Sequence, residues 1–293
     1  MNDAAAGIRA GLVAFCAGDA LGVPWEGCPP GAVRVDGIGR RDGWPPGATS
    51  DDTDQLLLAA RVITAGADGD VERRFLAGLD AALPSMRGVG PTTSRAVERY
   101  RAEGALRAVG GATNGAAMRA PAAGWAVPRR DARARRRLAL RLAHTTHADP
   151  AALGAACVVA AMVAAALDGR DPVAAARREA GDGPTAALAD VLAACDGRWE
   201  PPADGIPLDA APTAAAVVHV VAAGPHADLD AALRAALALG GDTDTVAALV
   251  GAVLGPGLLA DGPEPPWLGD AALPPAAELD ALAAALAARR ARG

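Results

Sequence analysis

Aromatic residues make up only 3% of this 293-residue chain, with two Phe, one Tyr and five Trp. A core without large rings must be packed from Ala, Val and Leu, which favours close contact between helices over a sheet. Strict alternation of polar residues with β-branched or aromatic residues, the mark of a half-buried strand, is almost absent. The sequence therefore predicts an all-α fold.

Lysine is absent, and the 34 acidic residues outnumber the 28 arginines to give a formal net charge of −6. A general nucleic-acid-binding protein carries a basic surface. We therefore expect no general binding to nucleic acid.

The four cysteines form no CxxC pair and fit no zinc-binding pattern. Three of them lie in apolar stretches, where cysteine behaves as a small hydrophobic residue. Asp3 and Arg9 interrupt the apolar N-terminal stretch, which excludes a signal peptide there. Residues 151–167 are uncharged but mostly alanine, which favours a buried helix over a membrane span. We expect a reduced, cytoplasmic protein with no membrane partner, and we take it to be a monomer.

Local signals place the helices. Ser50 can cap a helix that ends at Gly66, and Asp149 can cap another, with Pro150 in its first position. Further helices are predicted near 184–195, 212–223, 228–239, 243–254 and 275–291. The Pro/Gly-rich interruptions at 22–49, 197–212 and 255–274 are too short or too apolar for a flexible linker. We therefore predict a single domain over residues 1–293.

Two acidic clusters stand far apart in the chain, each where a helix should begin. They are Ser50-Asp51-Asp52-Thr53-Asp54 and Gly240-Gly241-Asp242-Thr243-Asp244-Thr245. Capping and the helix dipole explain one acid in each cluster, but further acids repel one another. Because carboxylate and hydroxyl oxygens suit hard divalent cations, we predict that the clusters meet as one metal site.

Glu26 follows a predicted helix end at Gly22, on a loop stiffened by Pro24. A solvent-facing glutamate is the alternative reading. Together with Asp51, Asp52, Asp242 and Asp244 it would give a formal charge of −5. Two divalent cations would nearly neutralise such a cluster.

Two polar segments resemble ligand contacts. The turn Thr113-Asn114-Gly115 precedes a predicted helix that carries Met118, so its backbone N–H groups could hold a phosphate. An ordinary cap with Met118 in the core is the alternative. His147 lies just before the Asp149-Pro150 helix, and a structural role is the alternative for it as well.

Five motifs in order, GDALG-x3-E, SDDT, NGAAMR, THADP and GGDTDT, resemble the ADP-ribosylglycohydrolase family from about residue 10 to 260. The resemblance implies a compact assembly of orthogonally packed helices with a binuclear Mg²⁺ or Mn²⁺ site in a central cleft. It also implies hydrolysis of an N- or O-glycosidic bond of ADP-ribose. Its positions assign the metal ligands to Ser50, Asp51, Asp52, Asp242, Asp244 and Thr245.

Glu26 matches a glutamate that lies near the metals in some members of the family, and we expect Glu26 or Asp52 to transfer the catalytic proton. Asn114, Gly115 and His147 match ligand contacts of the family, and we expect Thr113, Asn114, Gly115, Met118 and His147 to bind the substrate. One departure concerns the adenine ring: no aromatic residue lies beside Asn114, and Trp125 is a candidate for stacking on the base instead.

The implied reaction is attack of a metal-activated water on the bond between ADP-ribose and an acceptor, on a modified protein or a small molecule. Three alternatives stay open. The substrate could be a small nucleotide-like N-glycoside of secondary metabolism, the chain could bind ADP-ribose without catalysis, or paired metals could serve a phosphoesterase. The acceptor, whether arginine, serine, a nucleobase or acetate, is not encoded in any motif.

Overall fold

The computed structural model describes residues 3–66, 68–183, 185–260 and 262–292. These residues form an all-α fold without a β-sheet, which confirms the predicted class. The helices are α1 (Asp3–Gly22), α2 (Asp51–Thr64), α3 (Val71–Ala82), α4 (Pro91–Glu103), α5 (Gly115–Met118), α6 (Pro121–Ala126), α7 (Ala132–Ala143), α8 (Pro150–Leu167), α9 (Pro172–Asp182), α10 (Ala189–Cys195), α11 (Ala210–Ala222), α12 (Leu229–Leu237), α13 (Thr243–Leu258) and α14 (Ala276–Arg292).

Short 3₁₀ turns join some of these helices. They are η1 (Val23–Trp25), η2 (Pro30–Ala32), η3 (Asp68–Asp70), η4 (Thr185–Leu188) and η5 (Leu268–Asp270).

The predicted caps form at the starts of α2 and α8. The Ser50 hydroxyl accepts the Asp52 N–H at 3.1 Å, and the Asp149 carboxylate accepts the Ala151 N–H at 2.8 Å. Pro150 occupies the first position of α8, where its missing N–H costs nothing. These local signals therefore fix where α2 and α8 begin.

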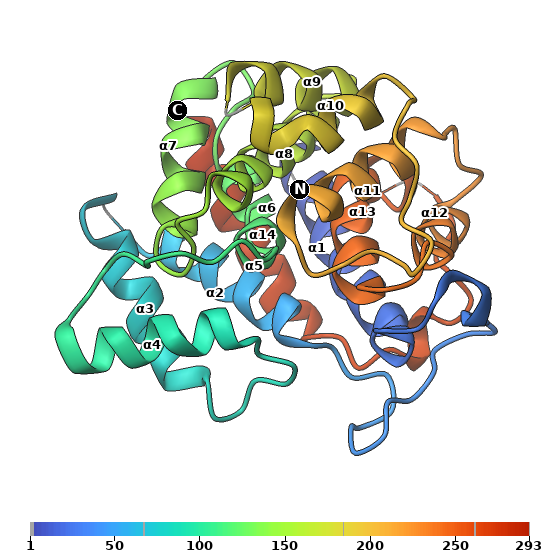
Figure 1. Ribbon diagram of the computed structural model, residues 1–293, viewed down its shortest axis with the longest axis horizontal. Coiled ribbons are helices and arrows are strands. Elements are labelled where there is room, and N and C mark those ends of the chain that lie inside the picture. The colour runs from blue at the N-terminus through green and yellow to red at the C-terminus, as the bar shows by residue number, and fades with distance from the viewer. Residues whose placement is uncertain (1–2, 67, 184, 261, 293) are drawn as a thin grey trace.

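Helices from the two ends of the chain lie side by side in the middle of the molecule (Figure 1). The blue α1 packs along the orange α13, and the red α14 packs against α1. Glycines allow the first contact: a Cβ at Gly18 would overlap the Ala247 backbone, and one at Gly251 would overlap the Ala14 carbonyl. The backbones of α1 and α13 thus touch, which brings the end of α1 next to the start of α13.

The same packing explains one difference from the predicted boundaries. α13 continues to Leu258, through Pro256, although proline was expected to end it near 254. Gly255 in this last turn lies against Ala10 and Ala14 of α1. Tertiary contact with α1 therefore holds a turn that the local sequence disfavours.

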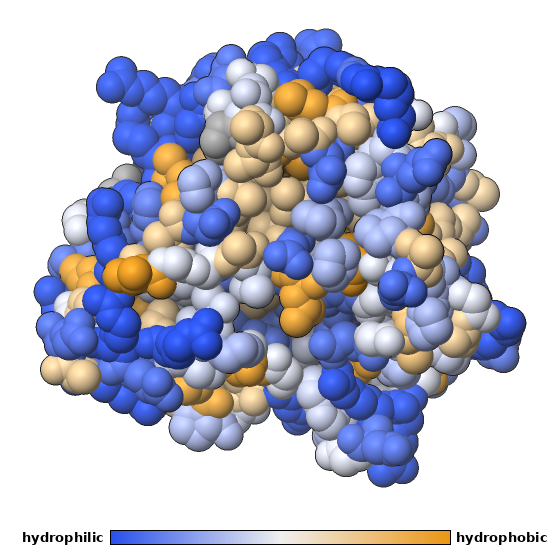
Figure 2. Space-filling model, in the orientation of Figure 1, coloured by the Kyte–Doolittle hydropathy of each residue, from blue (hydrophilic) through white to orange (hydrophobic). Residues whose placement is uncertain are grey.

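Among the described residues two helices, α1 and α8, are long and apolar enough to cross a membrane by length and composition. In the folded chain their apolar windows are 89% and 72% buried. The hydrophobic residues of α8 face neighbouring helices, in agreement with the predicted buried core helix. On the face shown in Figure 2, hydrophilic side chains dominate the periphery and apolar ones gather nearer the centre.

Candidate metal and substrate site

The glycine pair before α13 joins three segments of the chain. Gly240 and Gly241 have φ angles of +66° and +72°, and a Cβ on either would overlap neighbouring backbone. The Gly241 N–H and C=O pair with Cys28 and Gly27, each at 2.8 Å, and the Gly240 carbonyl accepts the Ile206 N–H at 3.1 Å. This close backbone approach sets the loop that carries Glu26 beside the start of α13.

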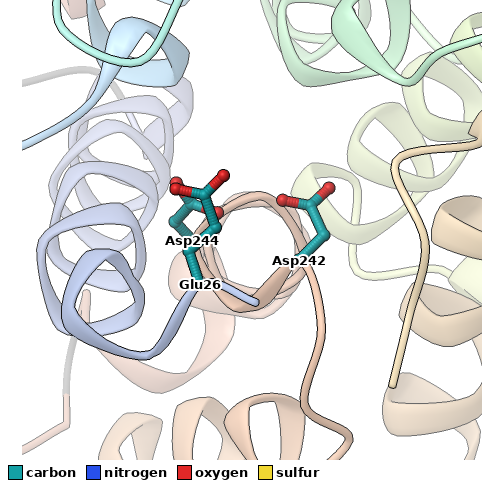
Figure 3. Close-up of side chains that lie close together, drawn as sticks. All are labelled: Glu26, Asp242 and Asp244. Carbon is teal, nitrogen blue, oxygen red and sulfur yellow. The ribbon is translucent and has the colours of Figure 1, made fainter. Parts of the chain in front are cut away.

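Asp242 occupies the N-cap position of α13, as predicted, but its side chain does not cap the helix. The carboxylate instead accepts a hydrogen bond from the Asn114 amide, whose Nδ2 also donates to Thr213 at 3.0 Å. One carboxylate oxygen each from Glu26, Asp242 and Asp244 lie within 4.8 Å of one another. Figure 3 shows Asp242 and Asp244 at one end of α13 with their carboxylates on the same side, and Glu26 beside Asp244.

The second acidic cluster begins α2. Ser50 supplies the cap, so Asp51 and Asp52 are not needed for that purpose. Asp51 Oδ2 accepts the Gln55 side-chain amide at 2.6 Å, whereas Asp52 Oδ2 is buried without a hydrogen-bond partner in the described part of the chain. A buried, unpartnered carboxylate oxygen costs free energy, so this atom fits a ligand that protein groups do not supply.

One further acid supports this cluster and is not predicted from the sequence. Asp19, on α1, is fully buried and accepts the Ser50 N–H at 3.0 Å, the Thr53 N–H at 3.1 Å and the Thr53 hydroxyl at 2.6 Å. It therefore locks the first turn of α2 onto α1. The available signal was its place in the GDALG motif, as a carboxylate inside an otherwise apolar stretch.

The two clusters line one cavity, which encloses about 680 Å³ of free space when its open mouth is included. Ten of the predicted residues line it: Glu26, Asp51, Asp52, Thr113, Asn114, Gly115, Met118, Asp242, Asp244 and Thr245. Acids from opposite parts of the sequence thus converge, as expected. The metal-binding and substrate-binding roles assigned to them stay predictions.

Other lining residues were not predicted. The segment from Gly88 to Thr93, at the start of α4, forms one wall, and Leu208 adds an apolar side chain that is 53% exposed. The Gly88-Val-Gly90-Pro91 sequence marks a turn before a helix. Nothing local to that sequence shows which cavity the turn faces.

Three of the residues named from the sequence, Ser50, His147 and Trp125, lie outside the cavity. Ser50 is buried at its cap, and His147 is fully buried behind Thr113, whose hydroxyl lies 2.9 Å from its Nε2. Trp125, the candidate for stacking on adenine, is 0% exposed and packs against Gly11 of α1, so it cannot receive a base. Trp125 is therefore the wrong candidate. Its burial depends on a tertiary contact with α1, which no local pattern in the sequence reveals. Among the residues described, no aromatic side chain belongs to the cavity lining itself, although the Trp44 ring lies beside the lining residue Gly88, 3.4 Å from the position that a Cβ would take.

Burial makes the acids difficult to ionise. Desolvation raises the pKa of Asp51 to about 7 and that of Asp242 to about 6, and the pKa values of Asp52 and Asp244 lie well above the ordinary range. Repulsion between neighbouring acids adds to burial in Asp52 and Asp244. An all-oxygen donor set with uncompensated negative charge fits hard divalent cations such as Mg²⁺ or Mn²⁺.

An all-α protein with a cavity lined by buried carboxylates is the class that fold and site define. A family described as ADP-ribosylglycohydrolase matches residues 2–293, so the chain belongs to the ADP-ribosylglycohydrolase family. A solved structure titled "ADP-ribosylglycohydrolase-related protein complex" is similar over 99% of this chain and 100% of its own, with a TM-score of 0.83 and 29% identity. No curated protein matches the chain. The resemblance of the five motifs is thus confirmed at the level of the family.

Proposed function

We propose that the protein is a metal-dependent hydrolase that cleaves the glycosidic bond between ADP-ribose and an acceptor. Membership of a glycohydrolase family supports hydrolysis in general. The observation that carries the metal-dependent form is the single cavity in which Asp51, Asp52, Asp242 and Asp244 converge. A hydrophobic core has no use for four such carboxylates.

In this proposal two Mg²⁺ or Mn²⁺ ions are held by Ser50, Asp51, Asp52, Asp242, Asp244 and Thr245. Bound divalent cations would lower the pKa of water and polarise ribose hydroxyls. Asn114 holds the Asp242 carboxylate in place, and Gln55 holds that of Asp51. Two of the proposed ligands would thus be held in place before any substrate binds.

Proton transfer falls to Glu26 or Asp52. Glu26 lies at the cavity with a side chain 29% exposed, where water and a leaving group could reach it, and it pairs with Arg41. Asp52 is buried, and its raised pKa favours the protonated form in the absence of a cation. A positioned acid or base of this kind contributes about 10²–10⁴-fold to the rate.

The test is a hydrolysis assay with ADP-ribosyl-arginine, ADP-ribosyl-serine protein and O-acetyl-ADP-ribose, each with Mn²⁺, with Mg²⁺ and with EDTA. We expect at least one to release intact ADP-ribose, only with a metal present. Release of AMP would indicate a phosphoesterase instead. Binding of ADP-ribose without turnover of any substrate would identify a non-catalytic family member.

A second candidate substrate is a small nucleotide-like N-glycoside. The observation that favours it is the absence of an aromatic side chain from the cavity lining in the described residues, because such a side chain commonly stacks on adenine. NAD-like nucleotides and simple nucleosides assayed beside the ADP-ribosyl substrates distinguish the two cases. A higher kcat/KM on a substrate without adenine would establish the alternative.

We also propose, from sequence alone, that the chain acts as one domain over residues 1–293, as a cytoplasmic monomer. Size-exclusion chromatography with light scattering tests the last of these points.

A further inference from the structure

A buried arginine links the part of the cavity wall that carries Asp51 to the part that carries Thr113. Arg119, just after α5, is fully buried and forms no ion pair among the residues that the structure describes. Its guanidinium lies over the Phe75 ring, 4.9 Å from the centroid. An unpaired buried cation is costly, so hydrogen bonds and the Phe75 ring must offset the cost of burying Arg119.

One branch from Arg119 leads to the metal cluster. Nη1 donates to the Gln55 side-chain oxygen at 3.1 Å and to the Gly115 carbonyl at 2.6 Å. Because guanidinium only donates, Gln55 must present Oε1 to Arg119. Its Nε2 is then directed to Asp51, where it donates to Oδ2 at 2.6 Å.

The other branch leads to the predicted substrate turn. Nη2 donates to the Leu142 carbonyl at 3.1 Å and to the Thr146 hydroxyl. In the described part of the chain the Thr146 hydroxyl has no acceptor for its hydrogen other than His147 Nδ1, 2.7 Å away, and donation to that atom requires the Nε2–H tautomer of a neutral imidazole. His147 Nε2–H then donates to the Thr113 hydroxyl at 2.9 Å.

The end of this branch faces the cavity. Since His147 donates to Thr113, the Thr113 hydrogen is left for another acceptor. Its nearest protein acceptor is the Thr92 hydroxyl at 3.4 Å, a long contact, and both threonines line the cavity. Burial, with the Arg119 charge, lowers the pKa of His147 to about 3, so the neutral form persists at physiological pH.

We infer that Arg119 is a positioning residue that fixes hydrogen-bond direction on both cavity walls and makes Thr113 a donor to an acceptor oxygen of the ligand. The phosphate and ribose oxygens of ADP-ribose are acceptors of this kind, so the identity of the ligand rests on the proposed function. The direction of the network does not, because it follows from protein groups alone.

The first experiment needs no ligand. Histidine ¹⁵N NMR, with the His147 signal assigned through His147→Gln, should show unprotonated Nδ1 and protonated Nε2 from pH 5.5 to 8. Arg119→Met should abolish this fixed tautomer, whereas the matched control Arg290→Met should retain it. Arg290 is also buried and donates to backbone carbonyls, but near Gly124 and Val127, away from the cavity. A protonated His147 or the Nδ1–H tautomer in the wild type would overturn the inference.

The second experiment separates the branches by calorimetry. Thr113→Val should weaken ADP-ribose binding at saturating Mn²⁺ by about tenfold, the loss of one good hydrogen bond, and Thr113→Ser should restore it. Gln55→Leu should weaken Mn²⁺ binding measured without ADP-ribose, and Arg119→Met should weaken both. Unchanged ADP-ribose affinity in Thr113→Val would refute the donor role. If the wild type binds no ADP-ribose, the proposed function fails, while the NMR result still decides the network.

Discussion

At the scale of single residues, the site is a set of carboxylates that the protein buries without neutralising. Asp52 shows this best, because one of its oxygens has no hydrogen-bond partner in the described chain and three other acids raise its pKa. Such an arrangement lowers stability unless a cation binds. Function and stability therefore oppose one another at these positions, and this opposition can be measured.

Asp244→Asn should move the two properties in opposite directions. Removing a buried charge beside Asp242 and Asp52 should raise the melting temperature of the metal-free protein. Loss of an anionic ligand should weaken Mn²⁺ binding by about 10–100-fold or more and abolish metal-dependent release of ADP-ribose. Thermal melts in EDTA, calorimetry and the hydrolysis assay measure the three effects.

Asp280→Asn is the matched control, since Asp280 is 50% exposed and pairs with Arg9 on the surface. It should leave Mn²⁺ affinity and activity unchanged. Wild-type Mn²⁺ affinity in Asp244→Asn would exclude Asp244 as a ligand.

At the scale of helices, the site depends on contact between α1 and α13. Gly18 on α1 and Gly251 on α13 let the backbones touch, and Thr243 at the start of α13 donates to the Gly22 carbonyl at 2.9 Å. Asp19 lies on α1, and the loop that carries Glu26 follows that helix. Asp242 precedes the first residue of α13, and Asp244 lies in its first turn. The helix contact thus sets the separation of the acids.

Gly251→Ala should unfold at a lower urea concentration than wild type, because its Cβ would overlap the Ala14 carbonyl and force the helices apart. Overpacking of this kind costs about 1–3 kcal/mol. Gly257→Ala provides the comparison: it lies on the same helix, but nothing lies within 4 Å of its Cβ position. That variant should be neutral or stabilised by up to about 1 kcal/mol. Equal midpoints for the two variants would argue against tight packing at Gly251.

The features that the sequence predicts are local, and those that it does not predict depend on contacts between distant segments. Caps such as Ser50 and Asp149 are local, and the helices begin where these residues predict. The acidic clusters were recognisable because they contain more charge than a cap uses. The burial of Trp125 under α1 depends on a contact between segments far apart in sequence. The same is true of the role of Asp19 and of the link from Arg119 to Thr113, and no local pattern encodes any of the three.

At the scale of the whole molecule, the buried acids predict how stability responds to pH. The folded pKa values of Asp51, at about 7, and of Asp52 and Asp244, well above 3.8, exceed those of the unfolded chain. The metal-free folded protein therefore binds more protons than the unfolded chain at neutral pH, and its stability falls as pH rises. His147 and His144 act oppositely, because burial lowers their folded pKa values, and most of this effect is complete near pH 7.

Melting temperatures measured from pH 6.5 to 8 therefore follow mainly the carboxylates. In EDTA the melting temperature should fall by several degrees across this range. With Mn²⁺ it should instead hold or rise, because cations compete with protons for the same oxygens and deprotonation then favours the folded state. At a concentration 100 times its Kd, a ligand that binds only the folded state adds about 2.7 kcal/mol. Asp244→Asn should flatten the slope in EDTA, since it removes one of the titrating groups. A melting temperature in EDTA that rises between pH 6.5 and 8 would mean that the acids are already neutralised within the protein, and the case for a metal centre would lose its electrostatic basis.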